Sequence, residues 1–389
     1  MKHKGPPALW NRSLANDSTS LGMTNRAQLQ FPATVVKCRI MTVTVRSFAK
    51  INHGLRIGPL RPDGFHDLHT VYQTIALHDV IRVSAKRGDS IEIRCADPRV
   101  PCDPSNTCYR IAERALRALN ARVLVTIEIE KRLPVQGGLG AGSANAVATL
   151  LGLERALKKR IPDPDKLRIA SEVGSDLPLF LVGGTVLGVG RGEEVFPLPD
   201  FPATICVIAT PEIGVSTPKA FADWDRLVGN AGLDQNSVSP FDEGNGASSR
   251  SEKLTPPAHS DRMLEFSRAV SSWLSGLTQK TGRPLSGVPA RGRGRAETPL
   301  LDLVRTGIEN DFEQVVFPQY PELREVKSVL ERSGAAYASL SGSGSALYGL
   351  FRSQAKAARA AARLRRMGIQ AQVTATLTRP QYWKKVFDC

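Results

Sequence analysis

The stretch Pro134-Val-Gln-Gly-Gly-Leu-Gly-Ala-Gly-Ser-Ala-Asn-Ala146 contains four glycines, at positions 137, 138, 140 and 142. Glycine adopts positive φ easily and leaves the backbone open, so successive N–H groups of such a loop can converge on one ligand. A strand-like apolar run, Val123 to Ile129, precedes the loop, and a helical pattern from Val147 to Leu157 follows it. This order predicts a phosphate-binding site, because the helix dipole and the unpaired N–H groups of a helix N-terminus favour an anion.

Two well-known phosphate-binding motifs do not match this loop. A P-loop requires a lysine after its last glycine, whereas Ala141 follows Gly140 and Ser143 follows Gly142. The dinucleotide fingerprint requires another glycine three residues after its Gly-x-Gly pair, and for the pair Gly138 and Gly140 that position is Ser143. On the loop alone, a flexible segment without a ligand stays open as the alternative.

The composition is typical of a soluble protein with two lobes. The chain has 389 residues, of which 41% are hydrophobic, enough for a substantial core. The longest apolar runs are too short to cross a bilayer. The six cysteines include no Cys-x-x-Cys pair, which indicates reduced thiols in a reducing compartment. His66 and His69 lack a matching set of ligands for a structural metal. We expect a cytoplasmic protein of bacterial type rather than a plastid one.

The net charge of +15 favours anionic partners, either nucleic acid or phosphorylated small molecules. Much of this charge lies in the tract Arg283 to Arg295 and in the run Arg363 to Arg366. Charge clusters of this kind are more often solvated surface than binding sites. Nucleic-acid binding through the Arg-Gly tract therefore remains the alternative from a different functional class, and we expect no membrane partner.

The chain divides into an extension and two predicted lobes. Residues 1–40 show no strong periodicity and no signal-peptide core, and a strand begins directly after Met41, so we expect a dispensable extension or a native start at Met41. The first predicted lobe covers 41–210 and the second 211–389. Within the second lobe, residues 234–300 are loop-rich, although an apolar helical face with Phe266 and Val270 stands inside them.

The strands and helices alternate in a pattern typical of an α+β protein. Strands are predicted at 80–85 and 91–95, then a helix capped by Ser105. In the second lobe a helix over 321–333 is followed by strands over 335–340 and 346–351, a helix over 353–367 and a strand over 369–376. This order of helix, strand, strand, helix and strand is typical of a ferredoxin-like lobe.

Four further stretches, taken together with the glycine loop, identify a family. They are Phe48-Ala-Lys-Ile-Asn-His-Gly-Leu55, Pro62-Asp-Gly-Phe-His66, Gly174-Ser-Asp-Leu-Pro-Leu-Phe180 and Leu340-Ser-Gly-Ser-Gly-Ser345. In this order they resemble the motifs of the GHMP kinase superfamily, over about residues 45–351. The resemblance implies a two-lobed α+β fold. Its N-terminal lobe would carry a βαβ unit like that of ribosomal protein S5, its C-terminal lobe would be ferredoxin-like, and the active site would lie between them.

The resemblance also implies an activity and its catalytic residues. The motifs are most similar to those of kinases that use ATP and Mg²⁺ to phosphorylate the 2-hydroxyl of a cytidine diphosphate-linked methylerythritol, in the non-mevalonate route to isoprenoids. Asp176 matches the general base of the family and Lys50 its partner. A carboxylate can accept the proton of a hydroxyl, and a neighbouring lysine can orient that carboxylate.

Substrate-binding and cofactor-binding positions follow from the same resemblance. Asn52, Phe65, His66 and Phe221 match substrate-binding residues, with His66 reading the edge of cytosine and the two phenylalanines stacking on the ring. Lys131 and Asn106 match nucleotide contacts. The loop that would hold the ATP phosphates comprises Pro134, Val135, Gln136, Gly137, Gly138, Leu139, Gly140, Ala141, Gly142, Ser143 and Ala144.

The sequence departs from the family at three positions. Gln136 stands where glycine is usual, Ala144 where serine is usual, and His53 where an apolar residue is usual. The first two lie in the phosphate loop and put its affinity for the nucleotide in doubt.

Each matched residue also has a simpler interpretation. Asp176 could cap a helix, Lys50 could be a surface lysine, and residues 341–345 could be a hairpin turn. A GHMP kinase for a mevalonate- or homoserine-type alcohol is the alternative within the family. The stretch 63–66 favours a nucleobase over such a small alcohol.

Overall fold

The computed structural model describes residues 41–135, 137–200, 202–233, 259–281 and 308–387. The predictions for residues 1–40, for Gln136 and for the Arg-Gly tract at 283–295 lie outside this part of the chain. So do the loop-rich stretches on either side of helix α6 (His259–Thr281). That helix confirms the apolar pattern seen in the sequence, because Phe266 and Val270 are buried.

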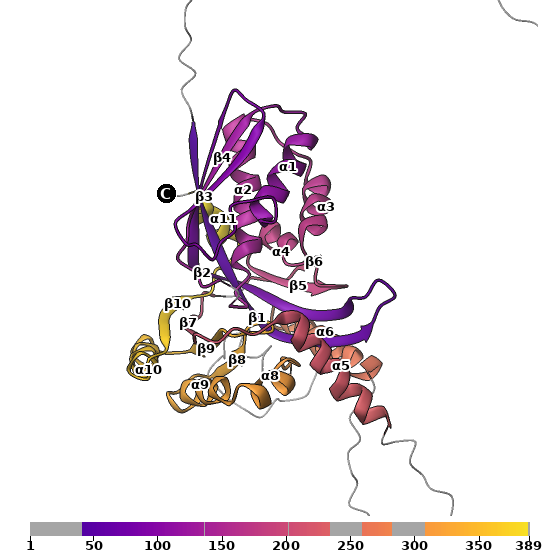
Figure 1. Cartoon of the computed structure of the whole chain (residues 1–389). Coiled ribbons are helices and arrows are strands. Elements are labelled where there is room, and N and C mark those ends of the chain that lie inside the picture. The colour runs from indigo at the N-terminus through magenta and orange to yellow at the C-terminus, as the bar shows by residue number, and fades with distance from the viewer. Residues whose placement is uncertain (1–40, 136, 201, 234–258, 282–307, 388–389) are drawn as a thin grey trace, which may run out of the picture. The chain divides into compact units, whose positions relative to one another are not determined.

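A long antiparallel hairpin organises the fold. Strand β1 (Thr42–Leu60) pairs with β2 (His66–Lys86) along nearly its whole length. Figure 1 shows this hairpin running from the helices of the first lobe to helices α5 (Thr217–Leu233) and α6 at its far end. The register of β1 shifts between Phe48 and Lys50 and again between Asn52 and Gly54. Bulges of this kind bend a strand and redirect its side chains, here on both sides of the lysine.

The first sheet surrounds the hairpin. Its strand order is β3-β4-β2-β5-β6, with β1 paired to β2 off this path. Strands β3 and β4 are parallel with α1 between them, which makes a βαβ unit. The other elements of this lobe are β3 (Ser90–Cys95), α1 (Thr107–Ala118), β4 (Leu124–Glu130), α2 (Ala141–Leu157), α3 (Asp163–Val173), α4 (Leu177–Val182), β5 (Thr185–Val189) and β6 (Glu194–Pro197).

The second sheet has four strands in the order β10-β7-β9-β8, all antiparallel. Figure 1 shows helices α8, α9 and α10 beside this sheet. Glycines with positive φ, Gly334 and Gly368, follow α9 and α10. The elements are β7 (Ile205–Thr210), α8 (Glu313–Gln319), α9 (Pro321–Arg332), β8 (Tyr337–Leu340), β9 (Leu347–Phe351), α10 (Gln354–Arg366), β10 (Gln370–Ala375) and α11 (Arg379–Val386).

Three apolar clusters hold these layers together. One lies in the first lobe, one lies in the second, and a third joins the two sheets. The joining cluster contains Ile51 and Ile75 of the hairpin together with Ile208 and Leu350 of the second sheet. Side chains buried this fully each stabilise the fold by about 1.5–3 kcal/mol. The hairpin therefore belongs to both lobes.

The predicted lobe boundary after residue 210 is wrong in two respects. Strand β7 belongs to the second sheet, where it pairs with β9 and β10, because both of its faces are apolar and covered: Val207 faces one cluster and Ile208 the other. Helix α11 returns to the first lobe, where Tyr382 OH donates to the Phe180 carbonyl and Trp383 Nε1 to the Val182 carbonyl.

The cap of helix α1 is also displaced by one residue from the prediction. Asn106, not Ser105, accepts the hydrogen bond of the Cys108 N–H. Its side chain donates in turn to the carbonyl of Pro101 at 2.6 Å. Asparagine is as good an N-cap as serine.

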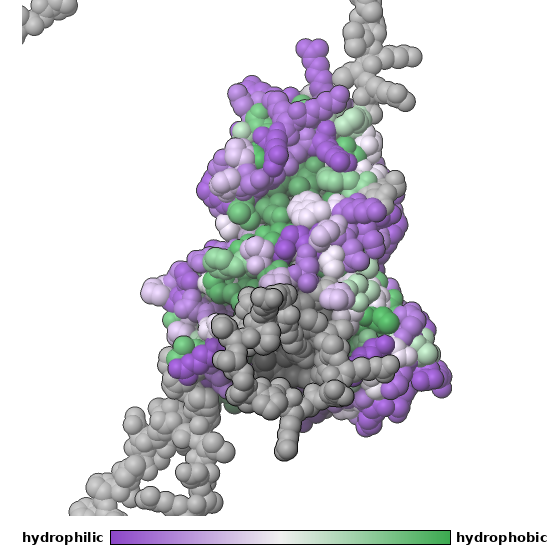
Figure 2. Space-filling view, turned by 180° about the vertical axis from the view of Figure 1, so that it is seen from behind, coloured by the Kyte–Doolittle hydropathy of each residue, from purple (hydrophilic) through white to green (hydrophobic). Residues whose placement is uncertain are grey.

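The visible outer surface is mainly polar. Figure 2 shows hydrophilic residues over most of the rear face, with hydrophobic side chains gathered in a band near its middle. Among the described residues, no helix combines the length and apolar character that crossing a membrane requires.

His53 is a polar side chain enclosed in the core. It is fully buried on β1. Because Tyr348 OH donates its proton to the Asn52 carbonyl at 2.8 Å, His53 Nδ1 donates to the Tyr348 oxygen at 3.3 Å. Its Nε2 is left as a buried acceptor without a partner among the described residues. Burial lowers the pKa of His53 from its ordinary 6.5 to about 3.

We expect this histidine to make folding sensitive to mild acid. Below about pH 6.5 the unfolded chain binds a proton at His53, whereas the folded chain does not. The free energy of unfolding therefore falls as the pH falls. Between about pH 7.5 and pH 5 the loss at this site is about 2 kcal/mol. His53→Leu removes it, and urea unfolding of both proteins at the two pH values measures the difference. Equal losses in the two proteins would contradict the assignment.

Candidate active site

A cavity of about 710 Å³ lies where the hairpin, the glycine loop and the second lobe meet. Both predicted catalytic residues and all four predicted substrate-binding residues line it. The lining side chains with polar or aromatic chemistry are Lys50, Asn52, Phe65, His66, Tyr72, Ser143, Ser175, Asp176, Arg191, Thr217, Phe221, Asp225, Phe312 and Ser343.

Lys50 is the buried cation of this cavity. Its Nζ donates to Asn52 Oδ1 at 2.7 Å and to the Gly138 carbonyl at 2.9 Å, and it lies 3.5 Å from Asp176 Oδ2. Residues two apart on a strand share a face, which is why Lys50 and Asn52 both point into the cavity. Burial lowers the pKa of Lys50, while the charge of Asp176 acts in the opposite direction. This lysine is not a surface residue.

Asp176 stands at the start of helix α4 but does not cap it. No side-chain capping hydrogen bond is made there. Instead its Oδ1 accepts a hydrogen bond from Tyr72 OH at 3.0 Å, and a third of its side chain stays exposed at the cavity. Burial raises the pKa of Tyr72 well above its usual value, so the phenol remains a donor. The carboxylate is thus oriented by two partners and remains accessible to a ligand.

The two glycine-containing loops touch each other. Gly138 has a φ of +72°. Its carbonyl accepts hydrogen bonds from Lys50 Nζ and, at 2.9 Å, from Ser341 Oγ. The N–H of Ala346 donates to the Gly137 carbonyl at 3.1 Å. Residues 341–345 do connect β8 to β9, so the hairpin-turn interpretation is correct as far as it goes. The turn also fixes the glycine loop against the second lobe.

Helix α2 begins at the glycine loop without a side-chain cap. Gly140 occupies its N-cap position in the left-handed conformation, with a φ of +68°. A serine or aspartate there would satisfy the first N–H groups of the helix. A glycine leaves them open, which fits a ligand anion at this helix end.

An aromatic group occupies the opposite end of the cavity. His66 stacks on Phe221 with 5.0 Å between ring centroids and 9° between ring planes, and its Nε2 lies 2.7 Å from Asp225 Oδ1. Phe65, at the tip of the hairpin, is 51% exposed. The guanidinium of Arg191 lies 5.0 Å from the centre of the Phe65 ring.

Two predicted nucleotide contacts lie elsewhere. Asn106 is occupied in capping α1. Lys131 Nζ binds the fully buried Asp79 at 2.6 Å. That carboxylate also accepts the N–H groups of Arg132 and Leu133 and the side-chain amide of Asn145. Lys131 does border a separate cavity of about 610 Å³, together with Pro134, Val135, Gly137 and Leu139 of the loop.

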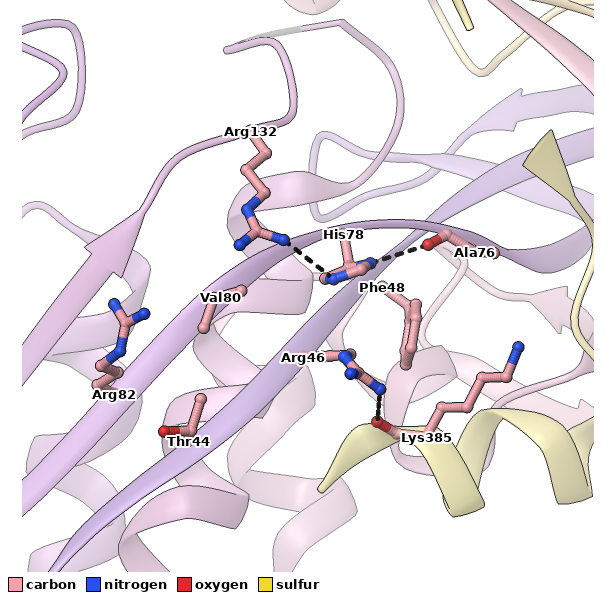
Figure 3. Close-up of a pocket in the computed structure, with 9 residues that line it drawn as sticks. All are labelled: Thr44, Arg46, Phe48, Ala76, His78, Val80, Arg82, Arg132 and Lys385. Atoms are coloured by element: carbon pink, nitrogen blue, oxygen red, sulfur yellow. Dashed lines mark hydrogen bonds between the residues drawn. The ribbon is translucent and has the colours of Figure 1, made fainter. Parts of the chain in front are cut away.

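A hollow on the outer face of β1 and β2 is basic but lacks the features of a catalytic site. Figure 3 shows Arg46 bonded to the Lys385 carbonyl and Arg132 to His78. Arg132 and Arg82 both pair with Glu130. In the part of the chain that the structure describes, no carboxylate lines this hollow and the glycine loop does not border it.

The model of the GHMP kinases N terminal domain matches residues 106–184, and that of the GHMP kinases C terminal matches 297–370. A relative from Solibacter usitatus, named 4-diphosphocytidyl-2-C-methyl-D-erythritol kinase, is 36% identical over 308 residues, which are 79% of this chain and 81% of the relative. The chain belongs to this family of GHMP kinases. It is therefore a kinase.

Solved structures agree with this placement. A crystal structure titled 4-(cytidine 5'-diphospho)-2C-methyl-D-erythritol kinase matches with a TM-score of 0.59 and 27% identity, and the match covers 86% of this chain and 98% of that one. A homoserine kinase from Cytophaga hutchinsonii matches with a TM-score of 0.60 at 19% identity, over 87% of this chain and 95% of that one. This second likeness concerns the GHMP kinase fold alone. The predicted two-lobed α+β fold is confirmed.

Several residues of this kinase site were missed in the sequence. Tyr72 and Asp225 contact the predicted Asp176 and His66, but nothing in their sequence positions indicates it. Asn310 donates to the carbonyls of Leu340 and Gly342 at 2.9 and 2.7 Å, and so supports the second glycine loop. Tyr72 and Asn310 are buried and Asp225 is exposed, so their common feature is a contact with a distant part of the chain, which only a structure reveals.

Replacing Gly138 tests the contact between the loops. A Cβ there would overlap the Ser341 carbonyl oxygen, and the positive φ adds strain. We expect Gly138→Ala to destabilise the kinase by more than about 2 kcal/mol. Gly142→Ala is the matched control, because its Cβ meets only Thr107 Oγ1 at 3.8 Å and alanine favours a helix by about 0.5–1 kcal/mol. Chemical unfolding of both variants measures this, and equal stability of the two would refute the contact.

Proposed function

We propose that this kinase transfers the γ-phosphate of ATP to the 2-hydroxyl of 4-diphosphocytidyl-2-C-methyl-D-erythritol. The observation that carries the proposal is the cavity itself. A carboxylate–lysine pair and an open helix N-terminus occupy one end of it, and an aromatic group with a histidine occupies the other. The name shared by relatives that match most of the chain supports the same substrate.

Asp176 is the proposed general base. It is the carboxylate beside the glycine loop, and Tyr72 and Lys50 both hold it in place. A positioned carboxylate can accept the proton that the substrate hydroxyl loses as it attacks phosphorus. Lys50 is proposed to orient this carboxylate and to join it to the phosphate loop through the Gly138 carbonyl.

ATP is proposed to place its phosphates against the glycine loop and the start of α2. The left-handed Gly140 and the uncapped helix end support this. The cavity of about 610 Å³ beside Lys131 adjoins this loop, because Pro134 and Val135 at the start of the loop line it. We propose it as the space for the nucleoside, in which Lys131 would act after exchanging part of its contact with Asp79.

Mg²⁺ is proposed to arrive with ATP. Magnesium in phosphoryl-transfer sites keeps several waters and takes one or two protein oxygens besides the phosphates. Among the described residues, no three His, Cys, Asp or Glu side chains group into a metal site, which fits such sparse ligation. Ser143 and Asp176 are the side chains whose oxygens could hold the ion, and the ion would neutralise charge on the phosphates.

An assay of three candidate substrates tests the proposal as a whole. We expect ADP release with the cytidine diphosphate-linked methylerythritol and none above background with mevalonate or homoserine, because the aromatic end of the cavity suits a flat base. A coupled ADP-release assay with each compound measures this. Turnover of mevalonate or homoserine without turnover of the cytidine compound would contradict the proposed substrate and favour a GHMP kinase for such a small alcohol.

Asp176→Asn tests the catalytic role. The amide keeps the shape of the side chain but accepts a proton poorly, so we expect kcat to fall by about 10²–10⁴-fold while ATP affinity changes little. Tyr72→Phe is the matched control. It removes one hydrogen bond to the same carboxylate and should cost about tenfold or less. A kcat for Asp176→Asn within the range of the control would remove Asp176 from the role of base.

A further inference from the structure

One face of helix α5 holds the imidazole of His66. Phe221 and Asp225 are four residues apart on this helix, so their side chains lie on the same face. Phe221 stacks flat on the imidazole, at 5.0 Å and 9°, and thereby sets the plane of the ring. Asp225 Oδ1, 2.7 Å from Nε2, sets its rotation within that plane. The His66 side chain is only 6% exposed, so the ring has little freedom to turn away.

The contact with Asp225 also decides which nitrogen carries the proton. An ionised carboxylate can only accept a hydrogen bond, so Nε2 must be the protonated nitrogen. In a neutral imidazole Nδ1 is then a bare acceptor. Among the residues that the structure describes, this Nδ1 has no hydrogen-bond partner. His66 lines the cavity, and it therefore offers an unused acceptor to a ligand there.

We propose that Asp225 is the positioning residue that makes this site select cytosine over uracil. The inference rests on the proposed function, in which a cytidine diphosphate-linked substrate occupies the cavity. Cytosine carries an amino donor at C4, whereas uracil carries a carbonyl acceptor at the same place. A fixed Nδ1 acceptor pairs with the amino group. Against the carbonyl of uracil it faces a second lone pair, and both groups remain unpaired.

The arrangement of the aromatic rings agrees with this edge-on contact. His66 covers one face of the Phe221 ring, and the Phe221 ring meets Phe312 edge to face at 4.9 Å. Phe221 therefore supports the histidine on the cavity wall. Phe65 is the ring that remains half exposed at the cavity. A base stacked on Phe65 would present its edge to His66.

Binding of CDP and UDP to the full chain tests the proposal. Calorimetry at about pH 8 gives the two dissociation constants. We expect the unaltered kinase to bind CDP at least about tenfold more tightly than UDP, since a site that leaves polar groups unpaired rejects the wrong ligand. In Asp225→Asn the amide can donate as well as accept, so either imidazole tautomer is allowed. The preference should then fall to within about threefold.

Two further variants separate positioning from a merely structural role. Asp225→Glu keeps a carboxylate and should keep the preference for CDP. Asp223→Asn is the matched control on the same helix, because Asp223 binds Lys219 and Arg226 and does not line the cavity. It should leave the ratio unchanged. Should Asp225→Asn fail to fold, Asp225→Ser provides the same measurement.

The outcomes distinguish this inference from the proposed function. If Asp225→Asn weakens CDP and UDP equally and preserves their ratio, Asp225 only supports the fold and the inference is overturned. If the unaltered kinase turns over the cytidine substrate but binds CDP and UDP equally, the inference fails and the proposed function stands. If it binds neither nucleotide and phosphorylates another alcohol, the proposed function has failed first.

Discussion

The amino group of Lys50 joins the parts of the candidate active site. From one atom it reaches the Gly138 carbonyl of the phosphate-type loop, the Asn52 amide on its own strand and the Asp176 carboxylate at the start of α4. A buried ammonium is costly unless it is paired. The three elements must therefore take their places together, and the site exists only when β1, the glycine loop and α4 are all correctly packed.

The long hairpin makes this arrangement possible. Its inner part contributes apolar side chains to the cluster that joins the two sheets, while bulges on either side of Lys50 and Asn52 keep these residues facing the cavity. Its tip carries Phe65 and His66 to the far end of the same cavity. One supersecondary element thus sets the distance between the phosphate end and the aromatic end. The proposed selection of the base depends on how helix α5 meets that tip.

The short motifs of the site were predictable because each is local. The glycine loop with its following helix, Lys50, Asp176 and His66 were identified from residues that stand within a few positions of one another, and all line one cavity. The features that the sequence did not predict are long-range contacts. Strand β7 joins the second sheet and α11 returns to the first lobe. Asn106 and Lys131 are occupied by a helix cap and by Asp79. None of these contacts can be predicted from the pattern of neighbouring residues.

The sequence by itself determined the chemistry that is present: an open phosphate-type loop, a carboxylate, a lysine and aromatic side chains, in an order similar to that of one kinase family. It did so because glycine conformation, strand alternation and helix periodicity are properties of neighbouring residues. Only the tertiary structure decided which groups meet. Tyr72 reaches Asp176 and Asp225 reaches His66 across more than a hundred residues of chain. Such contacts arise because α4 and α5, which belong to two different apolar clusters, both come to lie beside residues of β2.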